Sequence, residues 1–248
     1  MLLMINIPFK KGKKAMLITK NEHVILQSFA VTANAGYRRE VFKQNGGFDN
    51  KLKSGEDMEI YFRMLYKSNF KGIFDPRCKM YHHYRNSFKA LMKQWIWYGK
   101  GHPRVFCQYG SNGIHIYYPN LKVPKTEVEF EEWHALKKLV TIPFYTCGFI
   151  ALTPFNLFMS SAFFAFLLNV LGFKDLSQYF LVFSLFSFLL SFFNGVKLKY
   201  LRHSLSYSVI RLCLNFCFIL TGFLEGLKMK TIFLDISFER SEPTHLEK

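Results

Sequence analysis

The sequence predicts an α/β domain followed by an all-α transmembrane segment. Its 248 residues include 33 Lys and Arg against 17 Asp and Glu, a net charge of +16, and half of them are hydrophobic. The charge is uneven, because residues 1–138 hold 24 basic and 11 acidic side chains while residues 139–230 hold only seven and two. A basic water-facing part followed by an apolar part is typical of a membrane-attached protein. The many aromatic residues exclude a disordered chain, because their burial offsets the entropy of ordering.

The first domain is expected to span residues 1–101. Its first apolar run, Leu2 to Ile7, is too short for a signal peptide and precedes its lysines, so we expect no cleaved signal and a cytoplasmic domain. Residues 24–33 are apolar and predict a strand, and residues 37–42 predict a short helix that ends at Gly46-Gly47.

The second half of this domain alternates in the same way. Glu56 and Asp57 open a predicted helix, because apolar residues recur at helical spacing after them. Residues 70–74 predict a strand, and Ser87 can cap a helix that stops at Gly99. The five cysteines of the chain are odd in number and include no CxxC, which predicts reduced thiols and excludes zinc and disulfide frameworks.

The rest of the chain divides into three predicted parts. Residues 102–138 contain three prolines and predict a linker, whose charged last part, residues 127–138, predicts an interfacial helix. Residues 139–230 predict the transmembrane region, with about three helices, and residues 231–248 a polar tail.

The number of membrane crossings depends on three apolar runs, residues 139–172, 176–196 and 205–224. A spanning helix needs ~20 apolar residues, so the second and third runs each fit one crossing, while the first fits a tilted crossing or a hairpin of two short ones. Positively charged loops prefer the cytoplasmic side of a membrane. Three crossings place both basic segments there, the one before the first run and the one after the second, whereas four crossings would place the second segment outside. Three crossings leave Lys228 and Lys230 outside, unless the last segment is re-entrant or interfacial.

Candidate functional residues lie in the first domain. Glu56 and Asp57 are carboxylates in the first turn of a helix, where they either cap the helix and meet the positive end of its dipole or supply a general base. His82 and His83 are neighbours on a predicted strand and point to opposite faces, so at most one of them is a metal ligand.

Taken together, these residues resemble the C-terminal half of a family 2 glycosyltransferase domain of the GT-A type. The matching run is TANAGYRREVFKQNGGFDNKLKSGEDMEIYFRML, followed by FDPRCKMYHHYRNSFKALMKQWIWYGKG. In the family's pattern a small-residue and Asn turn precedes an Arg-Arg helix, GGFD and a Glu-Asp pair, and a strand ending in His and a Gln…Tyr-Gly helix follow. The order and spacing match, and the apolar helices behind them look like those of membrane-attached members. The resemblance implies a partial GT-A-like α/β domain.

The resemblance also implies roles for the matching residues. Asp57 would deprotonate the acceptor hydroxyl in an inverting transfer, and Glu56 would orient the acceptor or the loop. His82 matches a histidine that in some members helps to hold a divalent cation, Mg²⁺ or Mn²⁺, on the diphosphate. No Arg-Trp follows the Gln of the last helix, which favours transfer of a single sugar over processive synthesis. Substrate contacts are implied for four further residues: Asn34, Arg38, Arg39 and Gln94.

One part of the family's domain has no counterpart in the sequence. A complete member begins with a βαβ unit for the nucleotide and an Asp-x-Asp for the metal, whereas residues 1–31 contain a single acidic residue, Glu22. Divalent cations such as Mg²⁺ need several oxygen ligands, so we expect an incomplete ligand set and an incomplete donor site. The chain would then be a fragment, half of a pair whose other chain supplies the nucleotide-binding half, or an inactive relative.

The predicted function is a multi-pass membrane glycosyltransferase, or the C-terminal part of one, working at the cytoplasmic face. Its partners would be a nucleotide sugar, a lipid-linked or other hydroxyl acceptor, and membrane lipids. The alternative is a non-catalytic membrane anchor or interaction subunit derived from such an enzyme. Nucleic-acid binding is not expected, because the basic residues form no recognised reader motif and attraction to anionic lipids accounts for the same charge.

Overall fold

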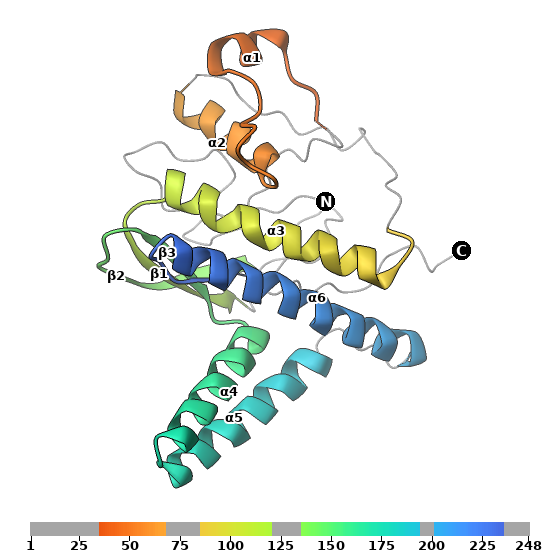
Figure 1. Ribbon diagram of the computed structural model, residues 1–248, viewed down its shortest axis with the longest axis vertical. Coiled ribbons are helices and arrows are strands. Elements are labelled where there is room, and N and C mark those ends of the chain that lie inside the picture. Colours follow the sequence, from red (N-terminus) through yellow and green to blue (C-terminus); the bar gives the residue numbers. More distant parts are fainter. Residues whose placement is uncertain (1–34, 68–84, 121–134, 194–200, 236–248) are drawn as a thin grey trace.

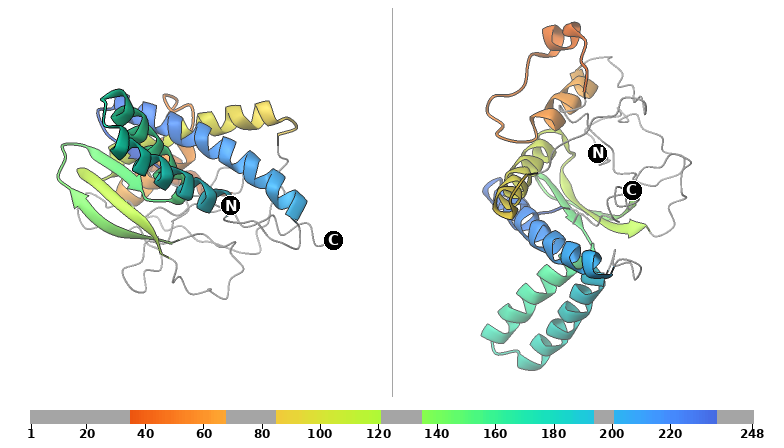
Figure 2. Two further views of the ribbon diagram at one scale, coloured as in Figure 1. Left: turned by 90° about the horizontal axis from the view of Figure 1, so that it is seen from below. Right: turned by 90° about the vertical axis from the view of Figure 1, so that its right-hand side faces the viewer.

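The computed structural model describes residues 35–67, 85–120, 135–193 and 201–235 (Figure 1). Helices α1 and α2 lie at one end of the molecule and α4 and α5 at the other, with α3, α6 and a sheet between them (Figures 1 and 2). The helices are α1 (Arg39–Asn45), α2 (Glu56–Lys67), α3 (Phe88–Tyr109), α4 (Pro154–Val170), α5 (Lys174–Phe193) and α6 (Leu201–Lys228), and the strands are β1 (Gly113–Asn120), β2 (Ala135–Ile142), β3 (Cys147–Ala151) and β4 (Phe233–Leu234).

The sheet is mixed and has the strand order β2-β1-β3-β4. Strands β1 and β2 are antiparallel, while β3 runs parallel to both β1 and β4. The ring of Phe149 on β3 lies 5.0 Å from Tyr117, 5.2 Å from Phe106 of α3 and 5.7 Å from Phe233. All four rings are buried, and each aromatic side chain removes about 150–250 Å² from water, so they form an aromatic core between the sheet and α3.

Helices α3 and α6 pack side by side and run in the same direction (Figure 1). Trp95 meets Phe218 with ring centroids 5.9 Å apart, and further along Arg104 donates from Nε to Glu225 at 2.9 Å. The two backbones approach closely at Gly99, where a Cβ atom would lie 2.5 Å from the carbonyl oxygen of Phe218. The helix was expected to stop at this glycine; that prediction was wrong, because Gly99 serves a close helix contact instead of a cap.

The expected linker over residues 102–138 was wrong as well. Within this range the structure has the last two turns of α3, the whole of β1 and the start of β2. Residues 135–138, assigned to an interfacial helix, are strand, and the apolar run from residue 139 supplies the rest of β2 and all of β3 before α4 begins. The polar tail expected from residue 231 was wrong for its first residues, because Phe233–Leu234 form β4 and Phe233 is buried. Other parts of these expectations lie outside the described residues: the strands over 24–33 and 70–74, residues 127–134, and residues 236–248.

Helices α4 and α5 form an antiparallel hairpin whose turn contains Gly172, with a φ of 89°. Helix α5 of the hairpin buries polar side chains and exposes apolar ones, the reverse of a helix in a water-soluble protein. Its buried residues are the serines Ser184, Ser187 and Ser191, whereas Tyr179 and Val182 are 74% and 68% exposed. Among the described residues, α5 and residues 205–228 of α6 are long and apolar enough to cross a membrane, and α4, with 17 residues, is a shorter apolar helix.

Candidate active site

The N-terminus of α2 presents the carboxylates of Glu56 and Asp57. Gly55 precedes them with a φ of 80°, a backbone conformation that favours glycine, and its carbonyl accepts the first helical hydrogen bond from Glu59 N at 2.8 Å. The Asp57 carboxylate accepts a hydrogen bond from the backbone N–H of Met58 at 2.8 Å. Both side chains are partly exposed, and α2 begins at Glu56, as its sequence predicted.

An aromatic group from the α1 region lies beside this carboxylate. Burial and, to a smaller extent, the negative charge of Asp57 raise the pKa of the Tyr37 hydroxyl to about 12. Tyr37 in turn packs edge-on against Phe42 of α1 and against Phe48, with ring centroids 5.4 and 6.4 Å apart. The phenol therefore stays protonated at neutral pH in the neighbourhood of Asp57.

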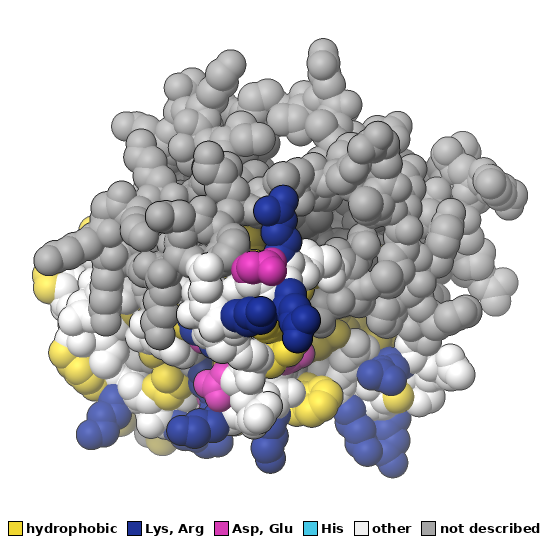
Figure 3. Space-filling model, turned by 90° about the horizontal axis from the view of Figure 1, so that it is seen from above, with side chains coloured by type: hydrophobic (Ala, Val, Ile, Leu, Met, Phe, Trp, Pro, Cys, Tyr) yellow, Lys and Arg dark blue, Asp and Glu magenta, His cyan; other side chains and the backbone are white. Residues whose placement is uncertain are grey.

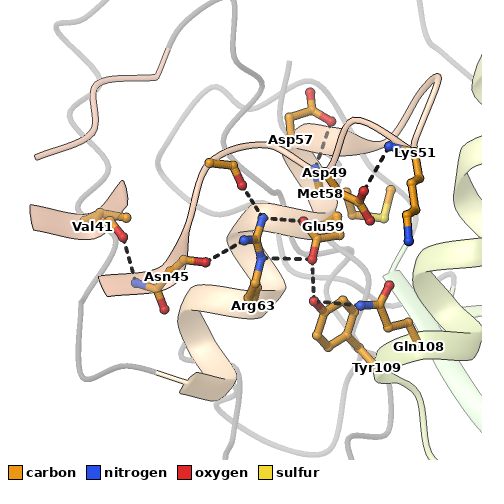
Figure 4. A network of polar contacts seen from close by, with 11 residues as sticks. Val41, Asn45, Asp49, Lys51, Asp57, Met58, Glu59, Arg63, Gln108 and Tyr109 are labelled. Carbon is orange, nitrogen blue, oxygen red and sulfur yellow. Dashed lines mark hydrogen bonds and ion pairs between the residues drawn. The ribbon is translucent and has the colours of Figure 1, made fainter. Parts of the chain in front are cut away.

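Behind Asp57, a buried ion pair holds α2 in place (Figure 4). Glu59 is 2% exposed, and Arg63 binds both of its carboxylate oxygens, at 3.0 and 2.7 Å. The same guanidinium donates to the carbonyl oxygens of Asn45 at 2.6 Å and Gly47 at 2.7 Å, and Tyr109 of α3 donates its hydroxyl to Glu59 at 2.6 Å. The network thus joins the end of α1, the middle of α2 and the end of α3.

Sequence reasoning missed this network, although a signal was present. A Glu four residues before an Arg on a predicted helix is the spacing of a helical ion pair. In Figure 4 the carboxylate of Asp57 points away from the network. Asp57 and Glu59 therefore differ in role, since Glu59 binds Arg63 and Tyr109 whereas the carboxylate of Asp57 lies outside this network.

The loop before α2 rests on α3 by a second close backbone contact. Ser54 donates its hydroxyl to the carbonyl of Trp97 at 2.5 Å. One turn further along α3, a Cβ atom on Gly101 would lie 2.5 Å from the carbonyl oxygen of Ser54. The start of α2 is therefore placed by a glycine in a different helix.

Replacing Gly101 with Ala should push Ser54 and the start of α2 away from α3. The added methyl overpacks a backbone contact, which typically costs about 1–3 kcal/mol of stability. We expect a lower midpoint of thermal unfolding. Gly36→Ala is the matched control, because a Cβ there meets nothing within 4 Å. Equal midpoints for the two variants would contradict the contact.

The other candidate residues lie on α1, on α3 and outside the described residues. Arg38 and Arg39 are exposed at the start of α1, on an end of the molecule where several Lys and Arg side chains face outward (Figure 3). Gln94 donates to the hydroxyl of Tyr98, one turn along α3, at 2.6 Å. Asn34 and His82 lie outside the described residues.

A metal-binding group does not form among the residues that the structure describes. No three His, Cys, Asp or Glu side chains gather there as ligands would. Glu56 and Asp57 alone do not provide the several oxygen ligands that Mg²⁺ or Mn²⁺ needs. The described residues alone therefore do not fit the Mg²⁺ or Mn²⁺ that the sequence resemblance implies.

Comparison with known proteins places the chain in a family. No curated protein and no solved structure matches it. Residues 17–224 match the family described as glycosyl transferase family group 2, and this range includes α1, α2, α3 and every candidate residue named above. The chain therefore belongs to glycosyl transferase family group 2.

Proposed function

We propose that the protein is a membrane-attached glycosyltransferase that transfers a sugar from a nucleotide sugar to an acceptor hydroxyl at the cytoplasmic face. Family membership makes sugar transfer the general class of activity. The observation that carries the proposal is the place of Asp57, a partly exposed carboxylate at the N-terminus of a helix that a buried ion pair anchors from behind.

Asp57 acts as the general base. It takes the proton of the acceptor hydroxyl while that oxygen attacks the anomeric carbon from the face opposite the nucleotide. The new bond joins the acceptor oxygen to the anomeric carbon, and the bond from that carbon to the phosphate oxygen breaks as the nucleotide diphosphate leaves. The positive end of the α2 dipole stabilises the negative charge that Asp57 needs to accept a proton.

The neighbouring residues contact substrate. Glu56 orients the acceptor or the loop, since it adjoins the base on the same helical turn. Arg38 and Arg39 pair with phosphate oxygens, for which the planar guanidinium is well suited. Asn34, Gln94 and His82 complete the proposed set, with His82 as the metal ligand that the family pattern implies.

The transferase is tested directly by adding nucleotide sugars to membranes that contain the full chain. UDP-, GDP- and dTDP-linked sugars are supplied one at a time with Mg²⁺ or Mn²⁺ and a lipid extract as acceptor source. We expect at least one donor to release its nucleotide in an extract-dependent reaction that membranes without the chain lack. Absence of release with every donor would favour the non-catalytic anchor instead.

Membrane attachment is tested by placing a charge on the exposed face of the hairpin. Val182 lies near the middle of α5 and is 68% exposed, so Val182→Lys is harmless in a water-soluble protein. In a bilayer, a Lys at the centre of a helix costs about 2.5–3.5 kcal/mol, so we expect less chain to resist extraction by alkaline carbonate. Gln178→Lys, nearer the end of the same helix, is the control, because its amine reaches the interface. Equal retention of both variants would argue against insertion.

A further inference from the structure

We propose that the α4–α5 hairpin alone crosses the membrane, entering and leaving on the side of the α/β domain, while α6 does not cross. This inference rests on the membrane attachment proposed above and replaces the three crossings expected from the sequence. It also specifies the partner of the exposed hairpin surface, which is the hydrocarbon core of a bilayer.

The sheet fixes whether the number of crossings is odd or even. Strand β3 precedes the three apolar helices and β4 follows them, yet the two are hydrogen-bonded neighbours, with Phe149 paired to Phe233 and Ile150 to Leu234. A single sheet cannot have strands on both sides of a bilayer. The chain between residues 151 and 233 must therefore cross an even number of times.

Contacts around β4 support this conclusion. Asp235 accepts a 2.6 Å hydrogen bond from His102 of α3, and its backbone carbonyl accepts another, also of 2.6 Å, from the amide of Asn156. Asn156 lies in the first turn of α4 and also donates to the carbonyl of Ala151. The base of the hairpin, the end of the sheet and the segment after α6 are thus joined on one side.

The hairpin has the surface and length of a bilayer-spanning pair. Two serines of α5 bond to the backbone of α4: the buried Ser184 donates to the carbonyl of Phe158, and the partly exposed Ser177 donates to that of Ala165. Small residues between helices with large apolar ones outside is the pattern of helices packed in lipid. At 1.5 Å per residue α4 is about 26 Å long and α5 about 30 Å, against a hydrocarbon core of about 30 Å. Lys174 and Asp175 lie at the tip, where they reach the opposite surface.

Helix α6 is held by the domain instead. It packs along α3 through the close approach at Gly99 and the ion pair between Arg104 and Glu225. Its buried side chains include Arg211, which donates to the backbone carbonyl of Ser191 in the last turn of α5, at the base of the hairpin, and charged groups are rare in helices that face lipid. Its length and apolar composition therefore reflect burial against protein on one side.

The charge distribution agrees with two crossings. Basic residues precede the hairpin at Lys137 and Lys138 and follow it at Lys197, Lys199 and Arg202, while the tip pairs one Lys with one Asp. Two crossings place both basic segments on the cytoplasmic side and the neutral tip outside, as positive loops prefer. Lys228 and Lys230, which three crossings would leave outside, lie on the cytoplasmic side as well.

Labelling with a membrane-impermeant maleimide tests the hairpin. Cysteines are introduced singly at exposed positions in the full chain, as Lys138→Cys, Lys174→Cys and Lys230→Cys, with Val182→Cys as the lipid-facing control. Peptide mass spectrometry reads each site separately, so the native cysteines stay in place. In right-side-out and inside-out vesicles, positions 138 and 230 should be labelled from the same side and position 174 from the opposite side. Position 182 should react only after detergent is added.

The outcomes separate this inference from the proposed function. Labelling of positions 138 and 230 from opposite sides of a carbonate-resistant chain would overturn the hairpin and leave membrane attachment in place. Labelling of position 174 from the same side as the other two would also overturn the crossing. A chain that carbonate extracts entirely would contradict membrane attachment and the hairpin with it. Release of the nucleotide from the donor sugar tests the proposed transferase activity, and its result does not depend on any of these three outcomes.

Discussion

Replacing Asp57 with Asn should lower the rate of sugar transfer by about 10²–10⁴-fold, which is the usual contribution of a general base. The amide is nearly the same size as the carboxylate, but it cannot accept the proton of the acceptor hydroxyl. Its oxygen can still accept the hydrogen bond from Met58 N, so the start of α2 should keep its conformation. Initial rates of nucleotide release, with the donor that is active in the wild-type protein, provide the measurement.

Glu56→Gln is the matched control for this variant. Glu56 adjoins Asp57, is also partly exposed and carries the same charge, so both variants change the electrostatics of the helix end alike. We expect Glu56→Gln to raise KM for the acceptor more than it lowers kcat. A fully active Asp57→Asn protein, or equal losses of kcat in the two variants, would rule out Asp57 as the base.

Local signals in the sequence predicted three of the helix ends well. Helix α2 begins at Glu56, and Ser87 caps α3 by accepting a hydrogen bond from Ala90 N at 3.2 Å. Gly46 ends α1 with a φ of 78°. Each of these features depends on side chains and backbone within one turn, so a single sequence contains the necessary information.

The failures involve contacts between distant segments. Gly99 was expected to end a helix, but it meets the backbone of another segment at Phe218, and Gly101 of the same helix meets the backbone at Ser54. The same sequence pattern predicts a cap or a close approach, and only the fold decides between them. The apolar run from residue 139 was read as membrane helix because periodicity alone does not separate a buried strand from a helix.

The candidate site also combines features that are local in the sequence with contacts between distant segments. Asp57 was selected from its motif and its place in a first turn, both of which are local. Its supporting network depends on Tyr109, which lies 50 residues away from Glu59 in the sequence. The i, i+4 pair within α2 was visible, but nothing local indicated that it would be buried.

Replacing Arg63 with Met should lower the free energy of unfolding by about 3–5 kcal/mol, because it leaves the buried carboxylate of Glu59 without its counter-charge. The carbonyls of Asn45 and Gly47 also lose their donor, so the loop between α1 and α2 should loosen. Thermal and denaturant unfolding of the purified protein measure the loss. Transfer activity should fall as well, since the same network holds the helix that carries Asp57.

Two comparisons separate the buried pair from general effects of losing an arginine. Arg39→Met removes an exposed guanidinium and should change stability by no more than about 0.5 kcal/mol. The double variant Glu59→Leu/Arg63→Met removes both charges, so it should be more stable than Arg63→Met alone, because no uncompensated charge remains buried. If the double variant is as unstable as the single one, packing of the arginine stem, and not its charge, holds α2 in place.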